Sequence, residues 1–233
     1  MSRSDVGVVI PVRDGERYLA ETIRSVLAQT LSPADVVVVN DGSADATATV
    51  LREFSDAVRA VHQAPAGAAA AVNRGVDEVN GDLLAFLDAD DLWDPRKLAL
   101  QVAALARAPE LDAVFCHIRH FVSPELSAEE HASIACPAGS SPGISRCTLL
   151  VRRSAYERVG PFDSSWVVGE FVDWWSRAVD AGVRSVVLPD VLVDRRLHSG
   201  NSAARRLEDR VDYTRIARAA LHRRRFRAAG RIT

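Results

Sequence analysis

The chain lacks the features that mark secreted, membrane-spanning or nucleic-acid-binding proteins. Its three cysteines, Cys116, Cys136 and Cys147, are an odd number without CxxC spacing, so neither a disulfide framework nor a cysteine-rich metal site is indicated. No apolar run approaches the roughly 18 residues that a membrane span requires, and no signal-peptide pattern is found. A formal net charge of −2 gives no global attraction to nucleic acid. We therefore expect a cytoplasmic protein without a nucleic-acid partner.

The charges are distributed unevenly along the chain. Lys97 is the only lysine, arginines are concentrated from Arg205 to Arg231, and no acidic residue follows Asp212. A hydrophobic content of 48% is sufficient for one α/β domain with a sizeable core. We predict a domain over residues 1–204 and an arginine-rich C-terminal helix or tail over 205–233. A solvated helix face is the ordinary role of such a segment, and peripheral contact with a membrane or another protein is the alternative.

Hydrophobic periodicity predicts strands alternating with helices. Strands are expected at 6–10, 36–39, 58–62, 83–87, 113–121 and 186–188, and helices at 18–29, 50–54, 66–79, 94–108, 154–159 and 169–181. Pro11 is expected to end the first strand. Asp94 is expected to cap the N-terminus of the helix at 94–108. The alternation indicates an α/β fold with a mostly parallel central sheet and helices on both faces. Residues 123–143 break the pattern and are expected to form an irregular functional loop.

Acidic side chains follow three of the predicted strands. They are Asp14 after the first strand, Asp41 after the second, and Asp88, Asp90 and Asp91 after the fourth. Ligands bind outside the carboxyl ends of the strands in open parallel sheets. Neighbouring carboxylates repel one another unless a cation offsets their charge, and oxygen ligands suit Mg²⁺ or Mn²⁺. The pattern predicts a divalent metal site at Asp88 and Asp90, with turn formation as the alternative role of these residues.

Four blocks in register resemble a known family. The blocks are 8–14 (VVIPVRD), 23–30 (IRSVLAQT), 39–43 (VNDGS) and 81–91 (GDLLAFLDADD). In order and spacing they are similar to the family 2 glycosyltransferases of the GT-A fold, over roughly residues 5–100, with weaker similarity as far as residue 202. The resemblance implies a GT-A-like domain with a nucleotide-binding half over residues 1–100 and an acceptor half over 101–204.

The resemblance also implies a nucleotide-sugar donor, and UDP is the nucleotide most frequent in the family. The family holds its nucleotide with residues after the first strand, with the Asp of the Asp-Gly-Ser block, and with the first Asp of the Asp-x-Asp motif. At the matching positions stand Pro11, Val12, Asp14, Asp41 and Asp88. The second Asp of the motif is Asp90, which is expected to hold Mn²⁺ or Mg²⁺. His198, in a block similar to the family's closing basic and His element, is expected to be a metal ligand or a phosphate contact.

The family's inverting mechanism needs a carboxylate that deprotonates the acceptor hydroxyl. It is commonly found in a Glu-Asp pair at the start of a late helix, but here the pair reads Glu170-Phe171. Glu170 and Asp173 are therefore the two candidate bases. We favour Glu170, because the helix N-terminus stabilises its ionised form, whereas Asp173 lies one turn further and can pair with Arg177.

Several assignments remain open from the sequence. Trp174 and Trp175 point about 100° apart on the predicted helix, so one is expected in the core while the other contacts a sugar or acceptor. The acceptor itself is unknown, and the 123–143 segment is expected to contribute to its surface. Phe171 keeps a non-catalytic nucleotide-sugar-binding protein as an alternative, and a nucleotidyltransferase is the other. The expected location is cytoplasmic, with peripheral attachment to the inner face of the membrane as an option through the arginine-rich C-terminus.

Overall fold

The first half of the chain forms the predicted parallel sheet. In this computed structural model, which describes residues 5–200 and 211–229, four parallel strands lie in the order β3-β2-β1-β4. The strands are β1 (Val6–Val12), β2 (Asp35–Asp41), β3 (Arg59–Gln63) and β4 (Leu83–Phe86). The helices between them are α1 (Leu19–Leu27), α2 (Thr47–Glu53) and α3 (Ala68–Glu78). Because all four strands run in the same direction, their carboxyl ends meet at one edge of the sheet.

Pro11 lies inside β1 and does not end it, contrary to expectation. Strand β4 pairs with β1 only from Val6 to Val9, whereas β2 pairs as far as Val12. The Val9 carbonyl accepts a hydrogen bond from Leu87 N on the β4 side. Two residues on, the nitrogen of Pro11 faces the same side, where the pairing has already ended. Its missing N–H therefore removes no hydrogen bond from the ladder.

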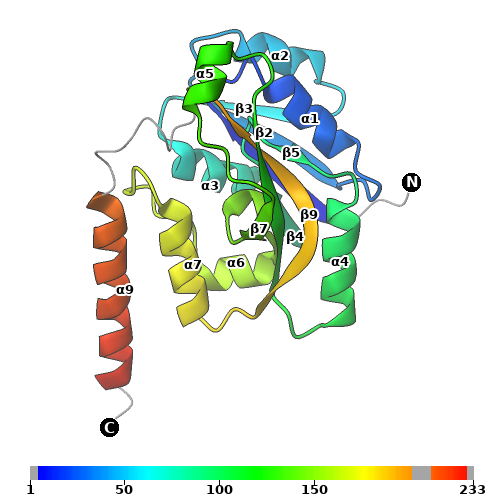
Figure 1. Cartoon of the computed structure of the whole chain (residues 1–233). Coiled ribbons are helices and arrows are strands. Elements are labelled where there is room, and N and C mark those ends of the chain that lie inside the picture. Colours follow the sequence, from blue (N-terminus) through cyan, green and yellow to red (C-terminus); the bar gives the residue numbers. More distant parts are fainter. Residues whose placement is uncertain (1–4, 201–210, 230–233) are drawn as a thin grey trace.

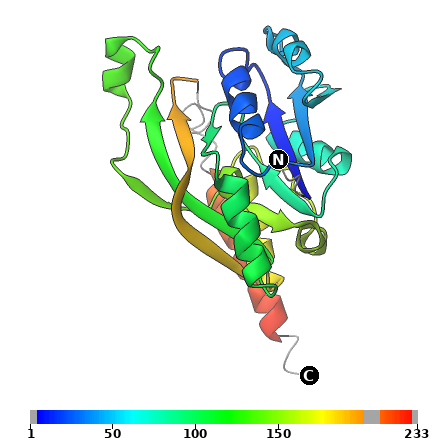
Figure 2. The ribbon, with the colours of Figure 1, turned by 90° about the vertical axis from the view of Figure 1, so that its right-hand side faces the viewer.

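The second half extends the same sheet with mixed pairing. Strand β8 (Leu150–Arg152) is antiparallel to both β4 and β6 (Ala113–Val122), and β6 runs parallel to the long β9 (Ser185–Leu197). Strand β9 also pairs with the two-residue β5 (Leu92–Trp93). Figure 2 shows β6 and β9 curling away from the first four strands, with helix α5 at their far end. This curl places β9 residues near the carboxyl end of β4.

Helices cover both faces of the sheet, which confirms the predicted α/β architecture. One face packs on α1, α2 and α4 (Lys97–Arg107), and the other packs on α3, α6 (Arg153–Val159) and α7 (Glu170–Asp180). Alternate residues of β1 divide between the layers, because successive side chains of a strand point to opposite faces. Val8 and Ile10 contribute to the first layer and Val9 to the second, all at 0% exposure.

Three local expectations differ from the structure. Residues 123–143 are not irregular throughout, because they contain α5 (Ala128–Ser133), with a capping box from Ser127 and Glu130, and β7 (Ser140–Gly143). Helix α4 begins at Lys97, and Asp94 accepts from Arg96 N in the preceding turn, so Asp94 does not cap the helix. The predicted strand at 186–188 is the first part of the much longer β9.

The arginine-rich C-terminal segment contains a helix that packs on the domain. Helix α9 (Val211–Ala229) lies beside α7 (Figure 1). Its Ile216 is 2% exposed and lies against Gly169, where an added Cβ would come within 2.9 Å of it. Arg223 donates to Asp173 and Ser176 of α7. The remainder of the predicted tail, 205–210 and 230–233, lies outside the described residues. Within the described part of the chain, no helix combines the length and apolar character needed to cross a membrane.

Candidate functional site

A cleft of about 600 Å³ opens at the carboxyl ends of the parallel strands. This is where ligands bind in open α/β sheets. Seven of the predicted site residues line it: Pro11, Val12, Asp14, Asp41, Asp88, Asp90 and His198. The cleft also receives Tyr18, Arg146 and Arg195, which the sequence did not single out. The structure thus brings together the residues predicted for the nucleotide and the metal, from both halves of the chain.

Asp41 fixes the loop that forms one wall of the cleft. The side chain is 3% exposed. Its Oδ1 accepts from Gln63 Nε2 at 2.8 Å and from Ala66 N at 2.7 Å, and its Oδ2 accepts from Gly67 N at 2.8 Å. A carboxylate has about four lone-pair sites, so one acceptor position remains after these three bonds. The predicted contact between Asp41 and a nucleotide base stays a prediction.

Asp14 stands in a turn that crosslinks two strand ends. It has φ of 51°, a left-handed conformation that Asp adopts more readily than most residues. Its backbone N donates to Ser43 Oγ at 2.9 Å, and its Oδ1 accepts from Ala44 N at 2.7 Å. The turn after β1 and the turn after β2 are therefore held together, and the exposed side of Asp14 faces the cleft.

Asp90 and His198 meet at the mouth of the cleft. Asp90 Oδ2 lies 3.1 Å from His198 Nε2, and both side chains are partly exposed. The ring of His198 packs on the buried ring of Tyr18, with centroids 4.7 Å apart. Gly200 N donates to Nδ1 of the same ring. Because Nδ1 accepts this bond, the proton of the neutral ring is on Nε2, where it points at Asp90.

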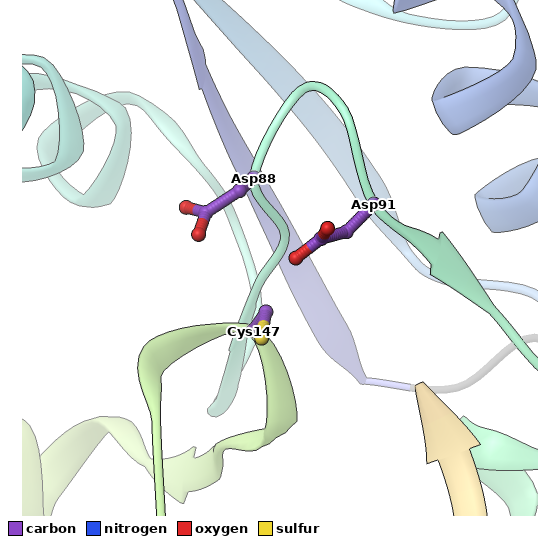
Figure 3. A group of neighbouring side chains, drawn as sticks. All are labelled: Asp88, Asp91 and Cys147. Carbon is purple, nitrogen blue, oxygen red and sulfur yellow. The ribbon is translucent and has the colours of Figure 1, made fainter. Parts of the chain in front are cut away.

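The turn between β4 and β5 buries Asp91 behind the cleft. Asp91 is 1% exposed, and its Oδ2 has no hydrogen-bond partner among the described residues. Donor atoms of Asp88, Asp91 and Cys147 lie within 4.8 Å of one another (Figure 3). Burial, followed by the charges of Asp90 and Asp88, raises the pKa of Asp91 well above its usual value. Burial also raises the pKa of the Cys147 thiol.

Arg196 holds this turn from the β9 side. Its backbone N donates to Asp91 Oδ1 at 3.0 Å, and its Nε donates to the Asp90 carbonyl at 3.0 Å. The guanidinium, 3% exposed, lies 4.7 Å from the ring centroids of both Tyr18 and Phe121. Cation–π contacts of this kind strengthen when they are desolvated. The acidic turn is thus fixed by a buried cation at its backbone, which leaves Asp88 and Asp90 to face the cleft.

Arg146 connects the first Asp of the motif with Glu170. It lies in the 3₁₀ turn η1 (Arg146–Thr148), and its Nη1 donates to Glu170 Oε1 at 2.8 Å while Nη2 donates to Asp88. Burial disfavours the charge of Asp88, but Arg146 and then Arg195 outweigh it and hold the pKa of Asp88 below its usual value. Sequence reasoning missed Arg146 because its partners are 58 and 24 residues away, with no local signal.

Asp173 is buried and ion-paired, which argues against the prediction that it is the base. It is 3% exposed, and both of its oxygens are held. Arg177 Nε donates to Oδ2 at 2.9 Å, as the sequence suggested, and Arg223 Nη1 donates to Oδ1 at 3.3 Å. The expectation that Glu170 and Asp173 face one cleft fails because α9 covers the Asp173 side of α7. Glu170 is the remaining candidate.

Trp174 is the member of the tryptophan pair that lies in the core, which leaves Trp175 for the predicted contact with a sugar or acceptor. It is 0% exposed, donates from Nε1 to the Gly160 carbonyl, and stacks on Phe162 with centroids 5.4 Å apart. Trp175 is half-buried and meets Phe115 edge-to-face at 4.8 Å. One member of the pair faces the core, as helix geometry requires, and the contact predicted for Trp175 is untested.

The donor atoms at this edge suit a divalent ion. Asp88 and Asp90 supply carboxylate oxygens, and the buried Oδ2 of Asp91 lacks a partner among the described residues. His198 Nε2, 3.1 Å from Asp90 Oδ2, would join them once its proton moves to Nδ1 in place of the bond from Gly200 N. Oxygen donors fit both Mg²⁺ and Mn²⁺, and an imidazole in the set favours Mn²⁺. The acidic group at the end of β4 can therefore hold a metal ion.

Comparison with known proteins gives one consistent result. Residues 7–160 match the family described as Glycosyl transferase family 2. An uncharacterized glycosyltransferase of Rickettsia typhi is 31% identical over 219 residues, which cover 88% of this chain and 68% of that protein.

Two solved structures share the fold. S. aureus TarS in complex with UDP aligns with a TM-score of 0.66 and 17% identity, covering 84% of this chain and 61% of that one. The mannosyltransferase PcManGT from Pyrobaculum calidifontis, in complex with GDP-Man and Mn²⁺, aligns with a TM-score of 0.67 and 23% identity, covering 88% and 61%. This chain therefore spans about three fifths of each solved structure.

Proposed function

The chain belongs to glycosyl transferase family 2, and we propose that it is an inverting, metal-dependent glycosyltransferase that takes its sugar from a nucleoside-diphosphate donor, UDP-sugar in the first instance. The observation that carries the proposal is the cleft at the strand ends, where the residues predicted for nucleotide and metal converge. The acceptor is a hydroxyl or another nucleophile.

The donor nucleotide is proposed to bind along the ends of β1 and β2. Pro11, Val12 and Asp14 supply the wall after β1, and Asp41 holds the 63–67 loop opposite them. Asp88 is proposed to contact the ribose. TarS is described with UDP and PcManGT with GDP-Man, so both nucleotides belong in a first test.

The diphosphate is proposed to lie near Asp90 and His198, which would hold Mn²⁺ or Mg²⁺ between them. The bound ion would supply positive charge that stabilises the diphosphate as it leaves. Arg195, which also lines the cleft, adds a fixed positive charge on the same side. Arg195 lies beside Asp91 and Asp88, and although burial opposes its charge, these carboxylates raise the pKa of its guanidinium.

Glu170 is proposed as the base. Its carboxylate takes the proton of the acceptor O–H, and the acceptor oxygen then forms a bond to the anomeric carbon on the face opposite the diphosphate. The bond from the anomeric carbon to the diphosphate oxygen breaks, and its electron pair leaves with the diphosphate, so the anomeric configuration inverts. A positioned base of this kind accelerates reactions by about 10²–10⁴-fold.

A non-catalytic nucleotide-sugar-binding protein is the alternative, and Phe171 is the observation that favours it. Phe171 stands where the family commonly has an Asp, and in the structure it packs edge-to-face on the core residue Phe115 at 6.3 Å. A binder of this kind would hold the donor without turning it over.

The test combines binding with turnover. UDP or GDP with Mn²⁺, at about 100 times the dissociation constant, should stabilise the fold by roughly 2.7 kcal/mol, a rise of about 5–10 °C in melting temperature for a chain of this size. EDTA should remove most of the rise. Release of nucleoside diphosphate from a panel of nucleotide sugars would then separate enzyme from binder. The absence of any shift with every nucleotide and ion would refute the donor site.

The location of the protein is proposed from charge alone. After Asp212, the sequence through residue 233 has seven arginines and no acidic residue. A basic segment of this kind is attracted to anionic lipid. We therefore propose a cytoplasmic enzyme whose α9 touches the inner face of the membrane, and co-sedimentation with vesicles containing phosphatidylserine would test this.

A further inference from the structure

Arg146 holds two carboxylates that the proposed function places on opposite sides of the reaction. Asp88 lies at the end of β4 and Glu170 begins α7, and both accept hydrogen bonds from the one guanidinium. The side chain of Arg146 is only 11% exposed. Its Nε has no hydrogen-bond partner among the described residues. The orientation of the guanidinium is therefore set by these two carboxylates.

The charge of Arg146 is needed at this position. Without this cation, the carboxylates of Asp88 and Glu170, 32% and 17% exposed, would face one another, with Asp90 and Asp91 close behind Asp88. Like charges in partly buried surroundings repel one another because water screens them incompletely. Burial opposes the charge of Arg146, but Asp88 and then Glu170 raise its pKa above the usual value, so it stays a cation.

Only an arginine fits the geometry. The planar guanidinium presents donors in a rigid fork, so Nη1 and Nη2 reach two different acceptors at once. A lysine at the same place carries the charge as a point and does not span both partners with fixed directions.

We propose that Arg146 is the positioning residue that aims Glu170 at the acceptor and couples it to the donor side through Asp88. The inference rests on the proposed function, since it takes Glu170 as the base. Without the guanidinium, the Glu170 carboxylate is repelled by Asp88 and loses the orientation that its hydrogen bond with Arg146 gives it. Arg146 touches neither the acceptor proton nor the anomeric carbon in this account, and it acts through Glu170.

A double-mutant cycle tests this role. Arg146→Met and Glu170→Gln are made singly and together, and kcat and donor KM are measured for each. Arg146→Met is expected to lower kcat by at least 30-fold with donor KM within about threefold, and to have almost no further effect in the Glu170→Gln background. Arg146→Lys is expected to recover part of the lost kcat. Independent, multiplicative losses in the double variant would overturn the coupling.

A binding measurement gives a second readout. Arg146→Met removes a cation beside Asp88, Asp90 and Asp91, so it should tighten Mn²⁺ binding in the absence of a nucleotide by threefold or more. The free ion is measured by its electron paramagnetic resonance signal. An unchanged or weaker affinity would show that Arg146 does not offset the charge of these carboxylates, and it would overturn the proposal. If Arg146→Met fails to fold, Arg146→Gln, which also removes the cation, carries both measurements.

The matched control is Arg152→Met. Arg152 is also half-buried, but it donates to the carbonyls of Leu111 and Leu105 and touches no carboxylate of the cleft. It should lose stability and keep both kcat and Mn²⁺ affinity. A wild-type protein without turnover on any donor would refute the proposed function, whereas an active wild type with an equally active Arg146→Met would refute the role of Arg146.

Discussion

Replacing Asp173 by Asn should separate the buried carboxylate of α7 from Glu170, the proposed base. Asp173 is buried and accepts from Arg177 and Arg223. Arg177 also donates to the Val159 and Pro161 carbonyls, so these two arginines join α7 to the 159–161 segment and to α9. Asparagine has nearly the same shape but no charge, and it keeps one oxygen as an acceptor. The other atom of its amide is an NH₂ group, which places donors opposite a guanidinium that has only donors, so one of the two hydrogen bonds is lost.

The magnitude follows from the number and burial of these bonds. A hydrogen bond to a charged group contributes about 1.5–3 kcal/mol, and truncating one side of a fully buried ion pair costs about 3–5 kcal/mol. Arg177 and Arg223 are 22% and 30% exposed, so water recovers part of this loss. We expect a loss of about 2–3 kcal/mol in the free energy of unfolding, which for this length is about 4–12 °C in melting temperature.

The assay is a thermal melt beside steady-state kinetics at 20 °C, well below the transition. Asp173→Asn should keep kcat within about threefold of the parent, because the carboxylate is closed to substrates. Glu170→Gln is the matched variant and should show the reverse, with kcat lowered by about 10²–10⁴-fold and donor binding kept. Loss of kcat by 100-fold in Asp173→Asn, with its melting temperature unchanged, would refute the reasoning and exchange the two roles.

Two further predictions concern the metal and a buried lysine. Asp90→Asn should remove the part of the nucleotide-induced rise in melting temperature that depends on Mn²⁺. If the variant still shows a rise that EDTA abolishes, the assignment of Asp90 as a metal ligand is contradicted. Lys97 is fully buried beside Trp93, and burial lowers its pKa from 10.5 to about 8. The unfolded chain therefore binds the extra proton of Lys97 between pH 8 and 10.5, so the parent should gain about 3 kcal/mol of stability relative to Lys97→Met as the pH rises through that window. The comparison is made with Lys97→Met because the buried thiols of Cys116 and Cys147, whose pKa values are raised, act in the opposite direction in both proteins. Parallel stability curves from urea unfolding would contradict the assignment.

The architecture could be predicted because its signals are local. Runs of β-branched residues such as Val36–Val39 are typical of buried strands in an α/β chain. Polar residues directly after such runs lie at the edge of the sheet where the carboxyl ends of the parallel strands meet. Asp14, Asp41, Asp88 and Asp90 therefore reached one cleft as expected. The two-residue β5 was not predictable, because two residues, Leu92 and Trp93, are too few to show a repeating hydrophobic pattern.

The errors in the candidate site arose where distant segments decide the environment. Asp173 and Glu170 are both acidic residues in the first turn of one helix, so the sequence does not distinguish them. The packing of α9, with Arg223 donating to Asp173, is what covers Asp173. Trp174 and Trp175 differ by the rotation of one residue, and the packing of Phe162 decides which is enclosed. Arg146 gave no signal at all, because an isolated arginine in a turn is ordinary until Asp88 and Glu170 are placed around it.

The packing of α9 on α7 has a consequence for biosynthesis. The four parallel strands have all been synthesised once β4 has been made, whereas the start of α7 is braced by residues of α9: Ile216 lies against Gly169, and Asp212 Oδ2 accepts from Val167 N. Arg223 follows its partner Asp173 by 50 residues, an interval of about 3–10 s at ordinary rates of translation. A nascent chain can thus fold its nucleotide half seconds before the helix that carries Glu170 is secured.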